Sequence, residues 1–171
     1  MRTEECAIEG VRIFDLEEHP DRRGSFFELF RREWLSDIFE DSMQVNCSKS
    51  VAGALRGMHY HNEQWDMWVP LSGRMRAGLA DLREGSSTFG TSTSLLMDDS
   101  GPRGLLIPPG VAHGFAALTD LILVYVVSRY YDGSDEHGIA WDDPALGIEW
   151  GIEEPLLSDR DRQNPRYEPQ G

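Results

Sequence analysis

The sequence has few cysteines, no long apolar run and a shortage of positive charge. Its 171 residues include only two cysteines, Cys6 and Cys47, which are too few for a disulfide framework. No apolar segment approaches the length that a membrane-spanning helix needs, and no signal peptide opens the chain. We therefore expect a cytoplasmic protein with reduced thiols.

The excess of negative charge limits the possible partners. Thirty acidic residues outnumber sixteen lysines and arginines, which gives a formal net charge of -14 at pH 7. Such a surface repels nucleic acids and anionic membranes, so we expect neither as a partner. A small anionic ligand remains compatible with this charge, because a few arginines can gather locally.

The middle of the chain has the punctuation of an all-β protein. From residue 44 to residue 131, short apolar segments alternate with breaks rich in Gly, Pro, Ser and Asp. This spacing favours an antiparallel sandwich or barrel over βαβ units. Leu121–Val127 is the most apolar segment, and we expect it to be a central strand. The breaks fall at residues 51–53, 72–73, 84–85, 98–104 and 108–110.

The segments before and after this core predict further elements of the same domain, which spans residues 1–171. Partial alternation over residues 10–16 predicts an edge strand, and residues 21–30 predict a turn that opens into an aromatic strand. Apolar residues at helical spacing predict an amphipathic helix over residues 32–40. We expect N-terminal strands and a helix at 1–43, a barrel core at 44–131, and a tail with short helical pieces at 132–171.

Three histidines are the first candidates for chemistry. His59 and His61 are separated by one residue, so both imidazoles lie on the same face of a strand. His113 follows a Pro-Pro-Gly turn in a later strand. A single histidine in a sheet is most often a hydrogen-bonded structural residue. Three on two converging strands instead indicate a barrel with a polar, titratable interior.

The spacing of these residues is similar to the two motifs of the cupin superfamily. The segment from Gly53 has the pattern G-x5-H-x-H-x4-D-x6-G, in which Asp66 stands where glutamate is usual, and P-x-G-x-x-H ends at His113. Three imidazoles and one carboxylate are suitable ligands for Fe, Mn, Ni or Zn. The resemblance implies the fold more strongly than the metal, because many cupins have lost the metal.

A closer resemblance, over roughly residues 10–161, is to the dTDP-4-dehydrorhamnose 3,5-epimerase family. It implies an all-β double-stranded β-helix (a cupin-like jelly-roll) with short peripheral helices, a homodimer, and no metal or organic cofactor. The motifs occur in family order: D-x-R-G-x-F-x-E at 21–28, Q-x-N-x-S at 44–48, L-R-G-x-H-Y at 55–60, D-L-R-x-x-S-x-T-F-G at 81–90, I-P-x-G-x-A-H-G-F at 107–115, Tyr-Tyr at 130–131, E-H-G-I-A-W-D-D-P at 136–144 and L-S-D-R-D at 157–161.

The resemblance implies three catalytic residues for a dTDP-4-keto-6-deoxyhexose substrate. His59 is the general base that removes a hydrogen α to the 4-keto group. Asp161 accepts the other imidazole N–H, and Tyr131 delivers a proton from the opposite face. Tyr131 could instead be a core aromatic, with Tyr130 the functional residue. Asp161 could instead belong to a helix cap that begins at Ser158.

The resemblance also implies residues that bind the nucleotide. Arg23 and Glu28 reach into the neighbouring subunit's pocket, with Phe26 packed close to the base or sugar. Four further residues contact the base and the diphosphate, and His113 lines the site. Solvated salt bridges are the alternative for Arg23 and Arg160. The four residues are Gln44, Asn46, Arg56 and Arg160.

Two departures from the family pattern fall inside the expected pocket. His61 stands where glutamine is usual, and Asp66 stands where the family has a lysine, whose acidic partner is replaced by Ala77. A lysine there stabilises the developing enolate, whereas an aspartate opposes it. We favour an epimerase or ketoisomerase for another nucleotide-linked 4-keto sugar. One alternative is a metal enzyme that uses His59, His61, Asp66 and His113; the other is a sugar-nucleotide-binding protein without catalysis.

Overall fold

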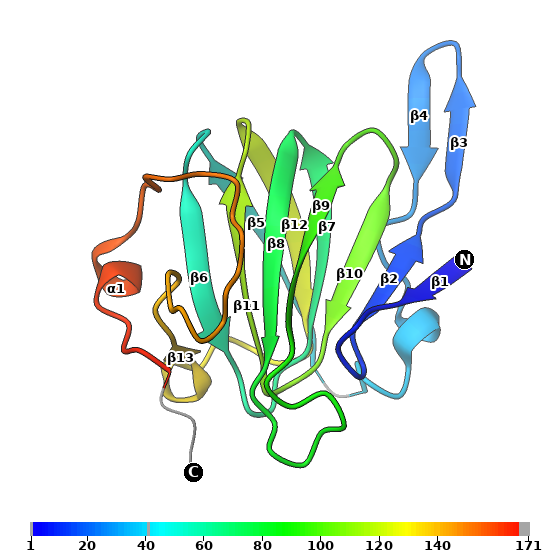
Figure 1. Cartoon of the computed structure of the whole chain (residues 1–171). Helices are drawn as coiled ribbons and strands as arrows, with labels where there is room; N and C mark the ends of the chain where they lie inside the picture. The colour runs from blue at the N-terminus through cyan, green and yellow to red at the C-terminus, as the bar shows by residue number, and fades with distance from the viewer. Residues whose placement is uncertain (1, 41, 168–171) are drawn as a thin grey trace.

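Two antiparallel sheets face each other in the computed structural model, which describes residues 2–40 and 42–167 (Figure 1). The first sheet has the order β1 (Arg2–Glu5), β2 (Arg12–Asp15), β10 (Arg103–Ile107), β7 (Asp66–Ser72), β12 (Leu121–Val127) and β5 (Gln44–Ser50). The second has the order β13 (His137–Gly138), β6 (Leu55–Tyr60), β11 (Val111–Ala117), β8 (Arg74–Asp81) and β9 (Ser92–Asp98). These facing sheets, with neighbours far apart in sequence, are the predicted jelly-roll.

The strands begin and end close to the breaks in the sequence. β7 ends before Gly73 and β8 starts after it, and residues 108–110 separate β10 from β11. The break expected over 98–104 is shorter than predicted, because β10 already begins at Arg103. β12 has β7 and β5 on its two sides, so the most apolar segment is an interior strand, as expected.

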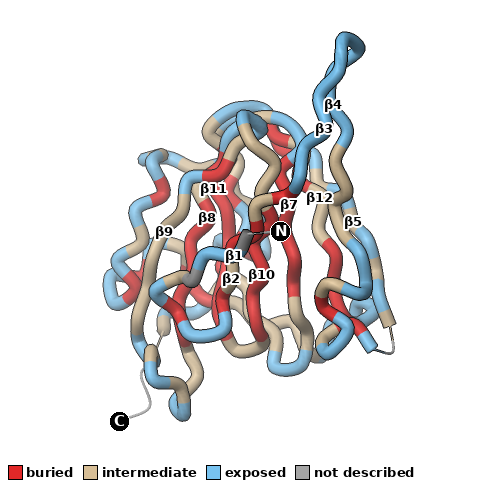
Figure 2. The backbone as a smooth tube through the Cα atoms, turned by 90° about the vertical axis from the view of Figure 1, so that its right-hand side faces the viewer, coloured by how far each residue is buried: buried red, intermediate tan, exposed pale blue. Residues whose placement is uncertain are grey.

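Apolar side chains from both sheets fill the space between them, where the backbone is mostly buried in Figure 2. The C-terminal tail covers the outer face of the second sheet with Ile139, Leu146 and Trp150. Gly78 of β8 makes this contact possible, since a Cβ there would lie 2.5 Å from the Trp150 ring. The tail is thereby fixed against the strands that carry the histidines.

Two predictions for the N-terminal region are wrong. Residues 32–40 form a short 3-10 helix, η1 (Arg32–Leu35), followed by turns. Its N-cap has no side-chain hydrogen bond, and Ser36 and Asp37 favour turns over helix. Residues 10–16 do not form an edge strand, because β1 pairs with the outer side of β2.

The short elements outside the sandwich include a hairpin and two helical pieces. β3 (Glu18–Asp21) pairs with β4 (Gly24–Phe27) in a hairpin that projects from the sandwich (Figure 1). The tail contains the 3-10 helix η2 (Gly133–Asp135) and the helix α1 (Asp159–Arg162). No helix among the described residues is long and apolar enough to cross a membrane. The fraying expected after residue 165 concerns in part residues 168–171, which lie outside the described residues.

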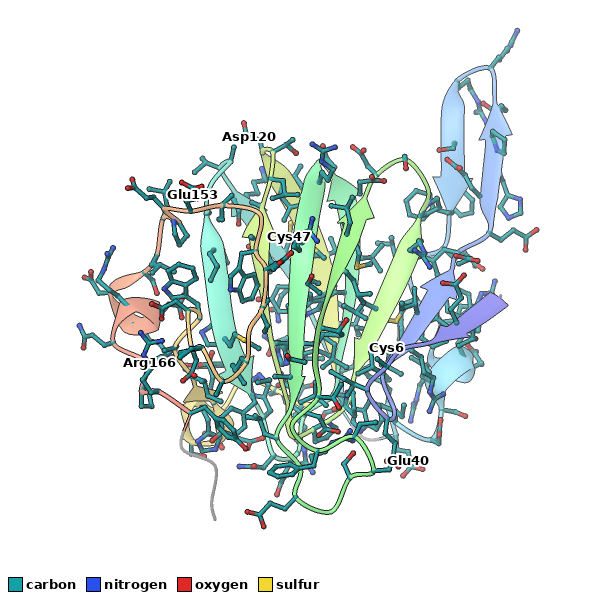
Figure 3. The ribbon with its side chains drawn as sticks, viewed as in Figure 1. Cys6, Glu40, Cys47, Asp120, Glu153 and Arg166 are labelled. Carbon is teal, nitrogen blue, oxygen red and sulfur yellow. The ribbon has the colours of Figure 1, made fainter. Side chains whose placement is uncertain are left out.

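Both cysteines are free thiols on separate elements (Figure 3). Cys6 follows β1 and Cys47 lies on the exposed face of β5. Cys6 and Cys47 are not joined to each other in this structure.

Candidate active site

A cavity of about 680 Å³ opens between the two sheets, with β5, β7 and β12 on one side, β6 and β11 on the other, and the tail at its edge. This volume is typical of a small-molecule site. The predicted site residues outside the N-terminal hairpin all line it. They are Gln44, Asn46, Arg56, His59, His113, Tyr131, Arg160 and Asp161.

Close pairing of β6 with β11 brings two of the histidines together. His59 lies directly opposite His113 in this pairing. The strands approach so closely at Gly57 that a Cβ there would lie 2.6 Å from the Cα of Gly114. Gly57 also has φ of 131°, a conformation that strains any residue with a side chain. Glycine at this position therefore places the two imidazoles over the same cavity.

His59 is held by a buried carboxylate. Its Nε2 lies 2.6 Å from Oδ1 of Asp161, which is only 5% exposed. Burial raises the pKa of Asp161, but the hydrogen bond and charge of His59 outweigh it, so this pKa lies below its ordinary value. Because a carboxylate only accepts, Nε2 carries the hydrogen and the Nδ1 lone pair of His59 remains free.

The short helix α1 aims Asp161 at the histidine. Ser158 is the N-cap of this helix, and its hydroxyl accepts the backbone N–H of Asp161 at 3.0 Å. The expected helix cap is thus Ser158, while the Asp161 side chain contacts His59. Leu156, just before the helix, forms an isolated β-bridge to Ala54, the residue before β6, which fixes α1 beside the histidine strand.

A second carboxylate, Glu136, was missed as a site residue by the sequence analysis. Its Oε1 lies 4.0 Å from Nδ1 of His59, and its Oε2 forms a 2.6 Å ion pair with Arg160. Burial raises the pKa of Glu136, but Arg160 and His59 more than offset this, so the pKa is lowered. Glu136 is the first residue of the 136–144 motif, which contributed to the family resemblance. The motif alone did not indicate that its glutamate lies beside His59.

Tyr131 lies at the cavity and Tyr130 is not among the residues that line it. The backbone N–H of Tyr131 donates to Oε1 of Gln44 at 3.2 Å, and Gln44 Nε2 donates to Asn46 Oδ1 at 2.8 Å. Tyr131 is 69% exposed, so it is not a core aromatic. A hydrogen bond from its side chain is among the causes that lower the pKa of Glu136, so the phenol lies beside this carboxylate at the cavity.

At the inner end of the cavity, His61, Asp66 and His113 form a compact cluster. Ligand atoms of these three side chains all lie within 4.8 Å of one another. His113 and Asp66 are buried, and His61 stands one residue beyond the end of β6. Burial is the main cause that lowers the pKa of His113 to about 4, so this imidazole is neutral at pH 7.

The three predicted residues of the N-terminal hairpin do not line the cavity of their own chain. Arg23 pairs with Asp21 in its own turn, and Glu28 pairs with Arg31, each at 2.6 Å. Phe26 is 65% exposed on β4. Within the single chain, Arg23 therefore forms the solvated salt bridge that was the alternative to a binding role. Its role in a partner's pocket stays a prediction.

Comparison with known proteins gives a consistent result. The sequence profile of the dTDP-4-dehydrorhamnose 3,5-epimerase family matches residues 5–168. The spore coat polysaccharide biosynthesis protein SpsL of Bacillus subtilis is 39% identical over 150 residues, which cover 85% of this chain and 98% of that protein. A Mycobacterium tuberculosis dTDP-4-dehydrorhamnose 3,5-epimerase is 38% identical over 98% of this chain and 88% of its own.

Solved structures agree with the sequence relatives. The crystal structure of ChmJ, a 3'-monoepimerase from Streptomyces bikiniensis in complex with dTDP-quinovose, has a TM-score of 0.86 and 37% identity. The match covers 94% of this chain and 85% of that one.

Proposed function

The chain belongs to the dTDP-4-dehydrorhamnose 3,5-epimerase family, and on this premise we propose the chemistry of its site. The protein is a nucleotide-sugar epimerase that removes a proton α to the 4-keto group of a dTDP-4-keto-6-deoxyhexose. The main evidence for this function is the hydrogen bond between His59 Nε2 and Asp161 Oδ1, which are 2.6 Å apart. This bond leaves the other imidazole nitrogen free beside a cavity large enough for a substrate.

His59 is the base in this mechanism. Its Nδ1 takes the proton from the carbon next to the ketone, and the electron pair moves towards the ketone oxygen to give an enolate. The imidazolium that forms is stabilised by Asp161 on one nitrogen and by Glu136 near the other. Asp161 also fixes the tautomer, so that the nitrogen facing the cavity has a lone pair.

Tyr131 is the acid that completes an inversion. Its phenol lies at the rim, and it returns a proton to the opposite face of the enolate. Return from His59 to the original face gives exchange without inversion. The two events can therefore be measured separately.

The nucleotide occupies the outer part of the cavity, where the arginines are. Arg56 and Arg160 are both exposed and line the cavity, so they offer planar forks to the diphosphate oxygens. Gln44 and Asn46 of β5 provide amide groups for the base. In the predicted homodimer, Arg23, Phe26 and Glu28 of the partner complete this end of the site.

Solvent deuterium incorporation tests the function. In D₂O, the protein should introduce deuterium into dTDP-4-keto-6-deoxyglucose at C3, C5 or both, and NMR of the product counts the centres. His59→Ala should lower this exchange by about 10²–10⁴-fold, the contribution of a positioned base. Full exchange by His59→Ala with a normal thermal melt would overturn the mechanism.

Replacement of the tyrosine tests the second half of the reaction. Tyr131→Phe should retain exchange but slow net inversion, because deprotonation and return on one face need only His59. Tyr130→Phe is the matched control, since Tyr130 has the same exposure but does not line the cavity. Equal loss of exchange and inversion in Tyr131→Phe would assign the phenol to binding instead.

A further inference from the structure

We propose that His61, Asp66 and His113 form a binding site for one divalent transition-metal ion, which acts as the electrophile at the inner end of the cavity. Two imidazoles and one carboxylate suit Zn²⁺ or Fe²⁺, and three protein ligands leave coordination positions open to a substrate oxygen. The catalytic part of this inference rests on the proposed epimerase function, whereas the binding part does not.

Hydrogen bonds orient both imidazoles as metal ligands. Nδ1 of His61 lies 2.8 Å from the backbone oxygen of Asp135, and Nδ1 of His113 lies 2.9 Å from that of Val111. A carbonyl oxygen can only accept, so each Nδ1 carries the hydrogen and each Nε2 keeps its lone pair. Metal-binding histidines are typically held in this way by a second partner.

The loop that carries His61 is clamped by the same residue that orients it. The Asp135 carboxylate accepts the backbone N–H of Asn62 at 2.8 Å and that of Glu63 at 3.1 Å. The backbone oxygen of His61 in turn accepts the N–H of Gly110 at 2.7 Å. The imidazole is therefore held in place although it lies beyond the end of β6.

Asp66 supplies the charge that a cation needs. It is only 3% exposed, and one carboxylate oxygen accepts a hydrogen bond from Gln64 at 3.0 Å. Among the side chains that the structure describes, none forms an ion pair with this carboxylate. A buried carboxylate without a cation is costly, and a metal ion removes that cost.

The ligand atoms come closer together when the ion binds. They lie within 4.8 Å of one another, whereas metal–ligand bonds of about 2.1 Å place neighbouring ligand atoms about 3.4 Å apart in a tetrahedral shell. Binding therefore requires the side chains of the cluster to move towards the ion, and at Asp66 such a movement alters one side-chain hydrogen bond, the one from Gln64.

The position of the cluster suits an electrophile for the ketone. His113 is the direct cross-strand neighbour of His59, so the ion and the base face the same bound molecule. The one lysine of the chain, Lys49, lies on the exposed face of β5, and therefore no ammonium group serves the inner cavity.

The reaction with the ion is balanced without any further reagent. The C–H bond α to the ketone breaks, its proton goes to Nδ1 of His59, and its electron pair forms the enolate double bond. The negative charge develops on the 4-oxygen, where the cation stabilises it. Return of the proton from His59 to carbon restores the site directly. Protonation of carbon by Tyr131 leaves an imidazolium and a phenolate, and transfer of one proton from His59 to Tyr131 through solvent then restores both.

Direct metal binding tests the site independently of activity. Protein dialysed against a chelator is titrated with Zn²⁺ by calorimetry and with Co²⁺ by visible absorption. We expect one ion per chain and ligand-field bands of a nitrogen–oxygen site. No binding above that of a chelator-treated triple variant, His61→Gln/Asp66→Asn/His113→Gln, would overturn the inference.

Single variants and a control locate the ion. Asp66→Asn preserves the shape of the side chain but removes its charge. Loss of a residue that only hydrogen-bonds a metal ligand weakens metal binding by roughly 10–100-fold, so loss of a ligand should weaken Zn²⁺ binding at least as much. His61→Gln should do the same, whereas His19→Gln, on the projecting hairpin, should bind normally. Unchanged affinity in both Asp66→Asn and His61→Gln would place the ion elsewhere and overturn the site.

Deuterium exchange distinguishes the role of the ion from the proposed function itself. We expect metal-free protein to lose exchange and to regain it when Zn²⁺ or Fe²⁺ is added back. Exchange that persists fully without metal and still depends on His59 would overturn the electrophile role while supporting the epimerase. Metal binding without any exchange under any condition would instead contradict the epimerase.

Discussion

At the residue scale, the candidate site is a histidine between two carboxylates. Asp161 bonds to Nε2 of His59 at 2.6 Å, and Glu136 lies 4.0 Å from Nδ1. The first contact was expected from the L-S-D-R-D motif. The second was not expected, because Glu136 lies 77 residues after His59 and nothing in the sequence around either residue indicates that they are neighbours in space.

Asp161→Asn tests the orientation of the base. An amide can donate to Nε2, which moves the imidazole hydrogen to Nδ1 and removes the lone pair that faces the cavity. We expect exchange to fall by about 10²–10⁴-fold with little change in KM, measured by NMR in D₂O. Asp159→Asn, an exposed residue of the same helix, is the control. A change in KM without a fall in the rate of exchange would contradict an orienting role.

At the element scale, the loop from β8 to β9 is organised by one buried aspartate. Asp81 is fully buried and accepts bonds from Arg83 at 2.8 Å and from the hydroxyls of Ser86 and Thr88 at 2.6 Å. This loop carries the D-L-R-x-x-S-x-T-F-G motif. The motif is thus structural, and it secures the turn behind the strand that pairs with β11.

Asp81→Ala should destabilise the fold. Removal of the carboxylate leaves Arg83 and two hydroxyls without their acceptor, and loss of one partner of a buried ion pair costs about 3–5 kcal/mol. A clear drop in melting temperature by calorimetry checks this. Asp21→Ala, which removes only an exposed pair with Arg23, should leave the melting temperature nearly unchanged. Equal effects in the two variants would contradict the buried network.

The same network predicts a loss of stability in acid. Burial raises the pKa of Asp81, but Arg83, Ser86 and Thr88 outweigh this and hold the pKa well below its ordinary value of 3.8. A group with a lowered folded-state pKa contributes stability above its unfolded pKa and loses that contribution as pH falls. Melting temperature should therefore decline below about pH 4. Asp81→Ala should show a smaller decline over the same range.

The elements also show what the sequence could predict. The strands of the sandwich follow glycine and proline breaks, which are local and readable. The helix expected over residues 32–40 failed because the apolar spacing was read without its interruptions: Ser36 and Asp37 favour turns, and no side chain caps the first turn. Likewise, β2 is not an edge strand because β1 pairs with it, and pairing partners are not visible in alternation alone.

At the scale of the whole molecule, the projecting hairpin is the feature that the single chain does not explain. β3 and β4 stand away from the sandwich and are almost entirely exposed (Figures 1 and 2). Three predicted binding residues lie on it or next to it, among them the exposed Phe26. A hairpin without a core of its own is marginally stable, and an aromatic strand left bare invites a partner.

The predicted homodimer is tested first by mass. One chain is 19.4 kDa, and light scattering at micromolar concentration should report about twice this value. Phe26→Asp, which places a charge on the exposed strand, should shift the protein towards the monomer. A wild-type mass of one chain at neutral pH would contradict the dimer.

Mixed dimers test whether the hairpin completes the partner's site. We expect His59→Ala to be inactive because its cavity lacks the base. We expect Arg23→Ala/Glu28→Ala to have weaker activity because its hairpin lacks two binding residues. Unfolded and refolded together, they form mixed dimers in which one cavity combines an intact His59 with an intact hairpin. With equal amounts and random pairing, about a quarter of the sites are then of wild-type composition. Exchange activity should therefore recover well above the sum of the two variants measured alone. If each hairpin instead serves its own chain, every cavity in the mixture keeps one defect, and no recovery occurs.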